Sequence, residues 1–173
     1  MHTHNPSYTI IFDLIDVLFT FNPAHIGTAQ QFTPIKEGIE IVRQCHAQVD
    51  TSGRKRHKLY ILSNAGIEWY QNLITHYPEL FSLFDGITTT AQSGYIKPDI
   101  KAFQYLISRY AIDPKTAIFI DDQAVNVYTA QAMGMKGIIC NNHTHVADQL
   151  IKLGVFNQSY QHPKNDTVAP ILG

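Results

Sequence analysis

The sequence has little charge and few cysteines. Only 16% of its 173 residues are charged, and 13 basic side chains nearly balance 14 acidic ones. No strong field therefore attracts nucleic acid or an anionic membrane, and neither is expected as a partner. The two cysteines, Cys45 and Cys140, form no CxxC pair and follow no secretory segment, which favours a reducing cytoplasm. No apolar run approaches the ~20 residues that a membrane-spanning helix needs.

Apolar residues are plentiful, at 45% of the chain, which indicates a packed core. A chain of this length usually forms one domain, because most domains have roughly 100–200 residues. We expect a single α/β core domain over residues 1–156, followed by a polar C-terminal tail over residues 157–173.

Short apolar runs alternate with amphipathic stretches, which is typical of a parallel sheet covered by helices on both faces. Five runs read as strands buried on both faces: Tyr8–Phe12, Leu59–Leu62, Gly86–Thr90, Ala117–Ile120 and Lys136–Cys140. The predicted fold is therefore a Rossmann-like, three-layer α/β sandwich with a central parallel sheet of about five strands.

Two helices have clear starting signals. The first is expected to begin near Pro34, capped by Thr33, with an apolar face that includes Ile39 and Val42. The second is expected after Asp99, which can cap it, with apolar residues at helical spacing.

Polar residues follow the predicted strands at the edge where an open parallel sheet collects its ligands. They are Asp13 after the first strand, Ser63 and Asn64 after the second, Asp121 and Asp122 after the fourth, and Lys97 in a Lys-Pro-Asp segment before a helix. Three carboxylates crowded at one edge repel each other unless a cation is present, and oxygen ligands favour Mg2+. A lysine and a hydroxyl aimed at the same place can hold a phosphoryl group.

These four segments resemble, in order, the four motifs of the haloacid dehalogenase-like (HAD) hydrolase superfamily. That superfamily has an Asp in a DxDG[TV]-like motif, a Ser or Thr after the second strand, a Lys in a GxxKPD-like stretch, and a DD or GDxxxD pair. The matching residues are Asp13, Ser63, Lys97 and Asp121-Asp122, followed by Asn126 as in a DDxxxN variant. One such string is a weak signal, but four in register on matching elements are specific.

The resemblance implies a mechanism and a set of ligands. Asp13 would attack phosphorus to form an aspartyl-phosphate that water hydrolyses. Asp13, the main-chain carbonyl of Ile15 and Asp122 would hold Mg2+, with Asp121 supporting the metal site and steadying Lys97. Ser63 and Asn64, together with Lys97, would bind phosphate oxygens.

One position departs from the superfamily. The second Asp of the first motif, which acts as general acid and base in most family phosphatases, is Ile15 here, and losing such assistance typically costs about 10²–10⁴ in rate. The neighbouring Asp16 is a poor substitute if the chain stays extended, because adjacent side chains then face opposite sides. Asp16 better suits a left-handed turn, where the family usually has Gly.

The family's cap domain has no space in the sequence. Only a small flap at residues 19–33 is free between the first two motifs, so the site is expected to be open. Within the family, open sites accompany large phosphorylated substrates or a neighbouring subunit that serves as lid. Dehalogenase and phosphonatase activities are disfavoured, because those relatives take substrate groups from their caps.

Three other features have competing interpretations. The basic run Arg54 to Lys58 resembles a nucleic-acid patch but precedes a strand, away from the catalytic edge, and a solvated loop is favoured. His143 and His145 follow the last strand but have no partner at zinc-ligand spacing. Aromatic residues in the flap segment can contact substrate or simply pack against the rim.

The sequence therefore predicts a HAD-like hydrolase with Mg2+-dependent phosphatase chemistry through Asp13, impaired or restricted in substrate by Ile15. The alternative is a non-catalytic module that keeps the pocket and binds Mg2+ and a phosphorylated ligand, or a partner protein.

Overall fold

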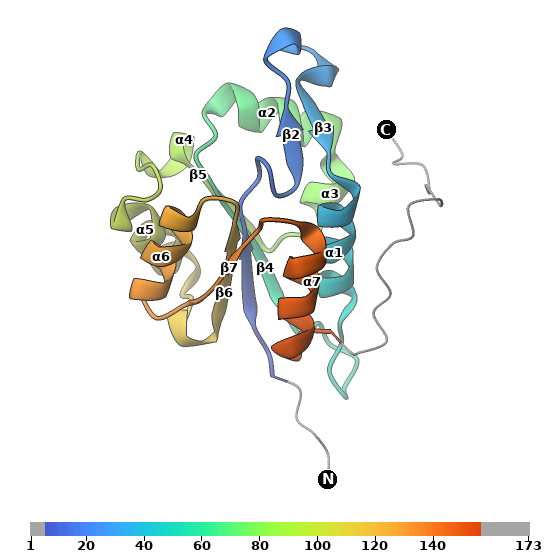
Figure 1. Cartoon of the computed structure of the whole chain (residues 1–173), viewed down its shortest axis with the longest axis vertical. Coiled ribbons are helices and arrows are strands. Elements are labelled where there is room, and N and C mark those ends of the chain that lie inside the picture. Colours follow the sequence, from blue (N-terminus) through green and yellow to red (C-terminus); the bar gives the residue numbers. More distant parts are fainter. Residues whose placement is uncertain (1–5, 157–173) are drawn as a thin grey trace.

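A computed structural model describes residues 6–156, and the predicted tail at residues 157–173 lies outside them. The chain forms a five-stranded parallel sheet (Figure 1). In spatial order the strands are β5 (Gly86–Thr89), β4 (Lys58–Ser63), β1 (Thr9–Phe12), β6 (Ala117–Asp121) and β7 (Lys136–Ile139). All five predicted strands are confirmed to within one residue at each end, and with them the predicted fold class.

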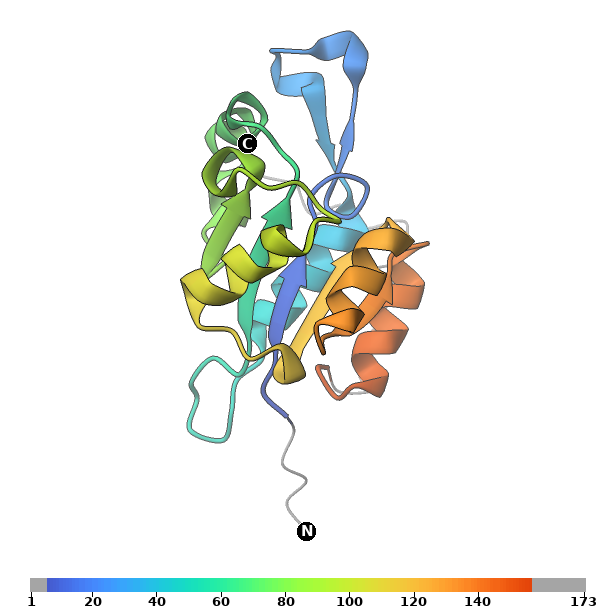
Figure 2. The same cartoon turned by 90° about the vertical axis from the view of Figure 1, so that its left-hand side faces the viewer.

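Helices cover both faces of the sheet, as Figures 1 and 2 show. They are α1 (Lys36–Ala47), α2 (Ile67–His76), α3 (Pro78–Phe81), α4 (Thr90–Ser93), α5 (Ile100–Tyr110), α6 (Ala124–Ala132) and α7 (His143–Lys152), with 3-10 turns at Pro23–His25, Ala29–Gln31 and Pro114–Thr116. No helix within residues 6–156 is long and apolar enough to cross a membrane.

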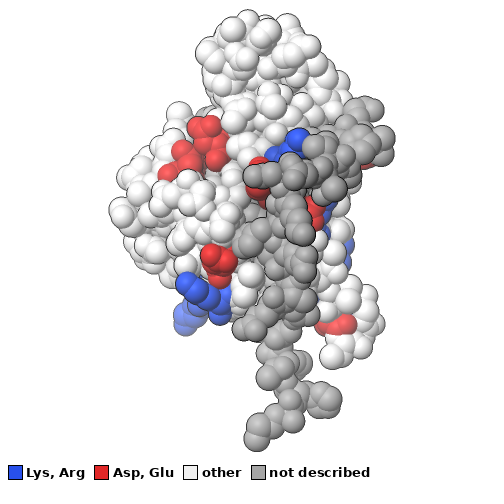
Figure 3. Space-filling model, turned by 45° about the vertical axis from the view of Figure 1, so that its right-hand side comes forward, with Lys and Arg blue, Asp and Glu red and all other residues white. Residues whose placement is uncertain are grey.

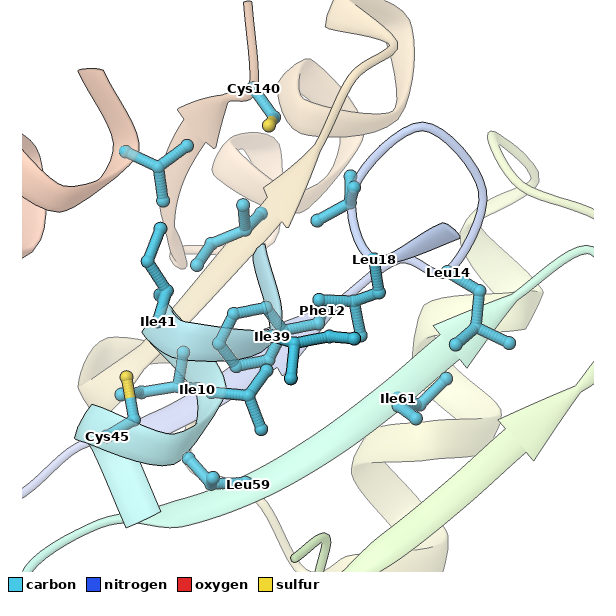
Figure 4. Packing of buried hydrophobic residues seen from close by; sticks show 14 of the residues in the cluster. Ile10, Phe12, Leu14, Leu18, Ile39, Ile41, Cys45, Leu59, Ile61 and Cys140 are labelled. Carbon is cyan, nitrogen blue, oxygen red and sulfur yellow. The ribbon is translucent and has the colours of Figure 1, made fainter. Parts of the chain in front are cut away.

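Alternate residues of the central strand face opposite layers, as the two-residue period of a strand requires. Ile10 and Phe12 pack in the core beneath α1, α2, α3 and α7, part of which is drawn in Figure 4. Ile11 packs in the second core, beneath α5 and α6. Burial on both faces explains why the strand sequence is continuously apolar.

The two predicted helix starts have different outcomes. Asp99 caps α5 as expected, since its side chain accepts a hydrogen bond from the main-chain N–H of Lys101. The cap predicted at Thr33 is wrong. Thr33 pairs with Thr20 in an antiparallel hairpin, and α1 begins at Lys36 with no side-chain cap. The hairpin uses the extended conformation of Thr33 and Pro34, so the helix starts after it.

The flap segment is this hairpin, formed by β2 (Phe19–Phe21) and β3 (Phe32–Pro34), and it projects from the body of the protein (Figure 2). Phe21 stacks on Trp69 of α2, with 4.5 Å between ring centroids, and Phe32 meets the same ring edge-on. The amide of Asn72 also donates to the carbonyl of Thr28. The aromatic residues Phe21 and Phe32 therefore pack the hairpin against α2, in agreement with the interpretation that the flap aromatics pack against the protein.

The basic run Arg54 to Lys58 is divided between buried and exposed residues. Arg56 and His57 are buried, and the Arg56 guanidinium donates to the carbonyls of Gly154 and Val155. On the face shown in Figure 3, Lys and Arg side chains occur only in small separate groups. The solvated-loop interpretation is therefore wrong for Arg56 and His57 and agrees with the exposed Arg54 and Lys55, while Lys58 is exposed at the start of β4.

Candidate active site

The three predicted carboxylates meet at the carboxyl edge of the sheet. Asp13 follows β1, Asp121 ends β6 and Asp122 follows it, and β1 and β6 are paired neighbours. One oxygen from each of the three lies within 4.8 Å of the others. Adjacent parallel strands thus bring together residues that are more than a hundred positions apart in the sequence.

Lys97 joins this cluster from the segment before α5. Its Nζ lies 2.8 Å from Oδ1 of Asp13 and 2.6 Å from Oδ2 of Asp121, and the side chain is almost fully buried. The ammonium group also sits 5.4 Å from the centroid of the Phe119 ring. A buried ammonium between two carboxylates balances part of their charge, which makes the cluster compatible with burial.

Asp121 is fully engaged by protein donors. Its Oδ1 accepts from the main-chain N–H of Gln123 at 2.8 Å, and its Oδ2 accepts from Lys97. The amide of Asn126 lies 3.0 Å from both oxygens. This arrangement supports the predicted role of Asp121 as the residue that steadies Lys97, and leaves Asp13 and Asp122 as the carboxylates with more freedom to bind a ligand.

The other two carboxyl groups hold their protons more tightly than usual. Burial raises the pKa of Asp13 from 3.8 to about 6, with Lys97 opposing the shift and Asp121 adding to it. Burial also raises the pKa of Asp122, and the charges of Asp121 and Asp16 act in the same direction. Carboxylates that repel each other in this way gain from a cation placed between them.

The donor set fits Mg2+. The cluster offers carboxylate oxygens only, which are the ligands this ion prefers. Beside it, Oδ1 of Asn126 is buried and has no hydrogen-bond partner among the described residues. A hydrated cation would supply donors to such an acceptor, because Mg2+ usually keeps several of its waters.

The loop after Asp13 turns back on itself. The main-chain N–H groups of Leu18 and Phe19 both donate to the carbonyl of Leu14, and that of Asp16 donates to the carbonyl of Phe19. None of these three bonds uses the carbonyl of Ile15, the main-chain ligand that the family resemblance implies. The Ile15 side chain is half-buried and packs against the core beneath α1, so this position offers no acid.

Asp16 adopts the left-handed conformation predicted for it, with φ of 60°. The premise that kept it away from the site is wrong, because the chain is not extended here but forms a turn. Its carboxylate lies near enough to Asp122 to raise the pKa of that group. Asp16 is exposed, and the group whose pKa it raises, Asp122, is a predicted metal ligand.

Ser63 and Asn64 lie after β4, beside the lysine. Ser63 is buried, and its hydroxyl accepts from the main-chain N–H of Ala65 at 3.2 Å. The Asn64 side chain holds the main chain of Lys97 on both sides, accepting from its N–H at 2.7 Å and donating to its carbonyl at 3.1 Å. The Asn64 amide nitrogen has two hydrogens, so one remains for the predicted phosphate contact. No spacing pattern in the sequence indicates this clamp.

His143 contacts the loop that follows Asp13. Its Nε2 lies 2.7 Å from the carbonyl oxygen of Val17 and 3.8 Å from Sγ of Cys140. His145 is exposed, and its main-chain N–H is capped by Asn142. The two histidines therefore do not converge on a common point, and His143 positions main chain instead.

Comparisons with known proteins agree with this geometry. The sequence profile of the haloacid dehalogenase-like hydrolases matches residues 52–134, which carry Ser63, Lys97, Asp121 and Asp122. This segment, just under half of the chain, therefore resembles that family. Asp13 lies outside the matched segment, but the fold places it within the same cluster.

Individual proteins are similar to parts of the chain or to its fold. A sesquiterpene phosphatase of Aspergillus oryzae is 32% identical over 93 residues, or 53% of this chain and 43% of that protein. A HAD phosphatase of Thermococcus onnurineus has a similar structure, with a TM-score of 0.63, 16% identity, and coverage of 78% of this chain and 86% of that one. A HAD enzyme of Bacteroides thetaiotaomicron, solved with magnesium and inorganic phosphate, has a TM-score of 0.57, 16% identity, and coverage of 77% and 93%. The chain spans less than half the length of the curated relatives it matches.

Proposed function

We propose that the protein is a Mg2+-dependent phosphohydrolase that acts through an aspartyl-phosphate on Asp13 and is restricted to substrates whose leaving group needs little protonation. The observation that carries the proposal is the convergence of Asp13, Asp122 and the Lys97–Asp121 pair at one strand edge. The names of two relatives, a phosphatase and an enzyme solved with magnesium and phosphate, support the same chemistry.

In the proposed reaction a carboxylate oxygen of Asp13 forms a bond to phosphorus while the bond from phosphorus to the leaving oxygen breaks. The leaving oxygen takes its proton from solvent, because Ile15 has none to give. Water then attacks the phosphorus, releases inorganic phosphate and restores the Asp13 carboxylate.

Other residues hold and orient these groups. Asp13, Asp122 and the Ile15 carbonyl would hold Mg2+, which when bound offsets the negative charge of the phosphoryl oxygens. Lys97 supplies a fixed positive charge, and Asn64 fixes the main chain of Lys97. The Ser63 hydroxyl, which accepts from the main-chain N–H of Ala65 and keeps its own proton to donate, would bind a phosphoryl oxygen. Such preorganised charge is the main source of catalysis in phosphoryl transfer.

The missing acid decides the substrate range. Acyl and aryl phosphates have leaving groups that depart as stable anions, whereas alkyl phosphates need a proton in the transition state. The absence of a cap domain between Asp13 and α1, where only the hairpin lies, supports an open site that also admits large phosphorylated substrates.

The test is Mg2+-dependent hydrolysis of an acyl phosphate, an aryl phosphate and an alkyl phosphate. We expect turnover of the first two only, abolished in Asp13→Asn. Ile15→Asp extends activity to the alkyl phosphate. Ile15→Asn does not, because Asn is similar in size to Asp but is not an acid.

The second candidate is the non-catalytic binding module, which Ile15 favours. Mg2+-dependent binding of inorganic phosphate without Asp13-dependent turnover on any of the three substrates would establish that function and reject the hydrolase.

A further inference from the structure

Large apolar side chains that are exposed gather at one end of the sheet. Among residues 6–156 they are Ile26, Val49, Ile67, Tyr95, Ile96, Ile100, Val125 and Tyr128. All except Val49 lie on segments that follow the carboxyl ends of strands, and so share the edge that carries Asp13 and Lys97. We call five of these residues the apolar rim. They lie in, or shortly before, the helices that come after β4, β5 and β6, and they are Ile67, Ile96, Ile100, Val125 and Tyr128.

The rim adjoins the site through the chain itself. Ile96 directly precedes Lys97, and consecutive Cα atoms are about 3.8 Å apart. Val125 lies two residues after Gln123, whose N–H donates to Asp121. Val125 and Tyr128 are three positions apart on α6 and share one of its faces, with 50% and 60% exposure. Exposed apolar side chains therefore begin one residue before Lys97 and three residues after Asp122.

Positive charge is sparse around the rim. Residues 123–135, which include α6, contain no charged side chain, and neither do residues 17–35, which form the hairpin above the site. Lys97 is buried by its ion pairs, and Lys101 lies over the ring of Tyr95, 5.7 Å from its centroid. A nucleotide or another polyanionic substrate would need cations beyond the phosphoryl site, and beside the rim only the exposed Lys101 is such a cation among the residues named.

We propose that the apolar rim binds the apolar body of a monophosphorylated substrate while the Asp13 cluster takes its phosphoryl group. The proposal rests on the proposed function and deepens it. Such a phosphohydrolase selects an apolar acyl or aryl monophosphate. The rim favours an apolar substrate body, and the lack of an acid at Ile15 favours a leaving group that departs as a stable anion. Exposed apolar patches commonly mark binding sites, and these side chains belong to segments at the strand edge that carries the Asp13 cluster.

Binding of phosphonates, whose carbon–phosphorus bond resists this hydrolysis, separates the rim from catalysis. With saturating Mg2+, titration calorimetry compares methyl-, butyl- and octylphosphonate. A fully buried CH2 group improves affinity by roughly fourfold, and partial burial on an open rim by less, so octylphosphonate is expected to bind at least about tenfold tighter than methylphosphonate. In the Ile96→Gln/Val125→Gln variant this ratio falls below about threefold. Val49→Gln, an equally exposed apolar site at the opposite end of the sheet, keeps the wild-type ratio.

The outcomes separate the two proposals. Equal affinity for the three phosphonates rejects the rim as a substrate site but leaves the phosphohydrolase standing. A rim that instead joins two copies of the chain gives equal affinities together with a dimer that the double variant dissociates in sedimentation, which also overturns the proposal. No binding of any phosphonate or of inorganic phosphate overturns the proposed function and the rim proposal together.

Discussion

Gly38 on α1 lies directly against the main-chain carbonyl of Val17, so that a Cβ on this glycine would be 2.2 Å from the carbonyl oxygen. The same Cβ would be 2.9 Å from Nε2 of His143, which holds that carbonyl. The helix α1 therefore lies very close to the loop that carries Ile15 and Asp16. This approach is possible because Gly38 has no side chain.

Gly38→Ala is expected to destabilise the protein by about 1–3 kcal/mol, although Ala is better than Gly in a helix by roughly 0.5–1 kcal/mol. The added methyl group must push the Val17 carbonyl away. The free energy of unfolding in urea measures the effect. Gly66→Ala is the control, because nothing lies within 4 Å of its Cβ position. Equal stability of wild type and Gly38→Ala would contradict the close approach.

Lys97→Met is expected to cost about 3–5 kcal/mol at neutral pH, because it leaves the buried carboxyls of Asp13 and Asp121 without their shared cation. Added Mg2+ should restore part of the loss. Thermal or urea unfolding with and without the ion measures both effects. The exposed Lys101→Met serves as control and should change stability by no more than about 0.5 kcal/mol. A Lys97→Met protein as stable as wild type would show that the ion pairs contribute little.

Stability without added metal should depend on the protonation of Asp13. Its pKa is about 6 in the folded protein and 3.8 for an ordinary carboxyl, so folding binds the proton more tightly. The contribution of Asp13 to stability is therefore complete below pH 3.8 and is lost as the pH rises through about 6. Unfolding in EDTA at several pH values, compared with Asp13→Asn, should show the stability of wild type relative to the variant falling over this range.

The same proton competes with Mg2+, so the affinity for the ion should weaken as the pH falls below about 6. Titration calorimetry at pH 5 and pH 7.5 would measure this change. Tighter Mg2+ binding at the lower pH would contradict the assignment of Asp13 as a ligand.

Asp16 gives a prediction about both backbone and charge. Asp16→Ala should destabilise the protein by about 1 kcal/mol, since φ of 60° disfavours residues that lack a short polar side chain, whereas Asp16→Gly should not. Both changes, and Asp16→Asn, should lower the pKa of Asp122, because they remove a charge that raises it. A carbon-13 titration of the Asp122 carboxyl measures that pKa. An unchanged value in all three variants would place Asp16 out of electrostatic reach.

Most of the fold was predictable because buried parallel strands leave a strong signal. The continuous apolar runs of β1 and β6 have no other simple interpretation, and their ends place Asp13 and Asp121 at one edge. The hairpin was missed because its two strands are three residues each, too short for a periodic pattern, and that error moved the expected start of α1 from Lys36 to Pro34.

The charged cluster was predictable for the same topological reason, but its supports were not. The clamp of Asn64 on Lys97, and the contact of His143 with Val17, depend on how loops far apart in the sequence meet. The prediction that Asp16 faces away from the site was wrong, because Asp16 itself is left-handed and side chains alternate between two faces only in an extended chain. The roles of Ser63 and Asn64 in binding phosphate remain predictions.

Arg56 connects both ends of the described chain. Its carbonyl accepts from the hydroxyl of Ser7, its guanidinium reaches Gly154 and Val155, and Pro6 lies against Gly154. Residues 6–156 thus form nearly a closed ring, which could be joined there and reopened at the hairpin tip. Such a circular permutant would keep the sheet and the Asp13 cluster and carry its new ends beside the mouth of the site, as attachment points for a designed lid.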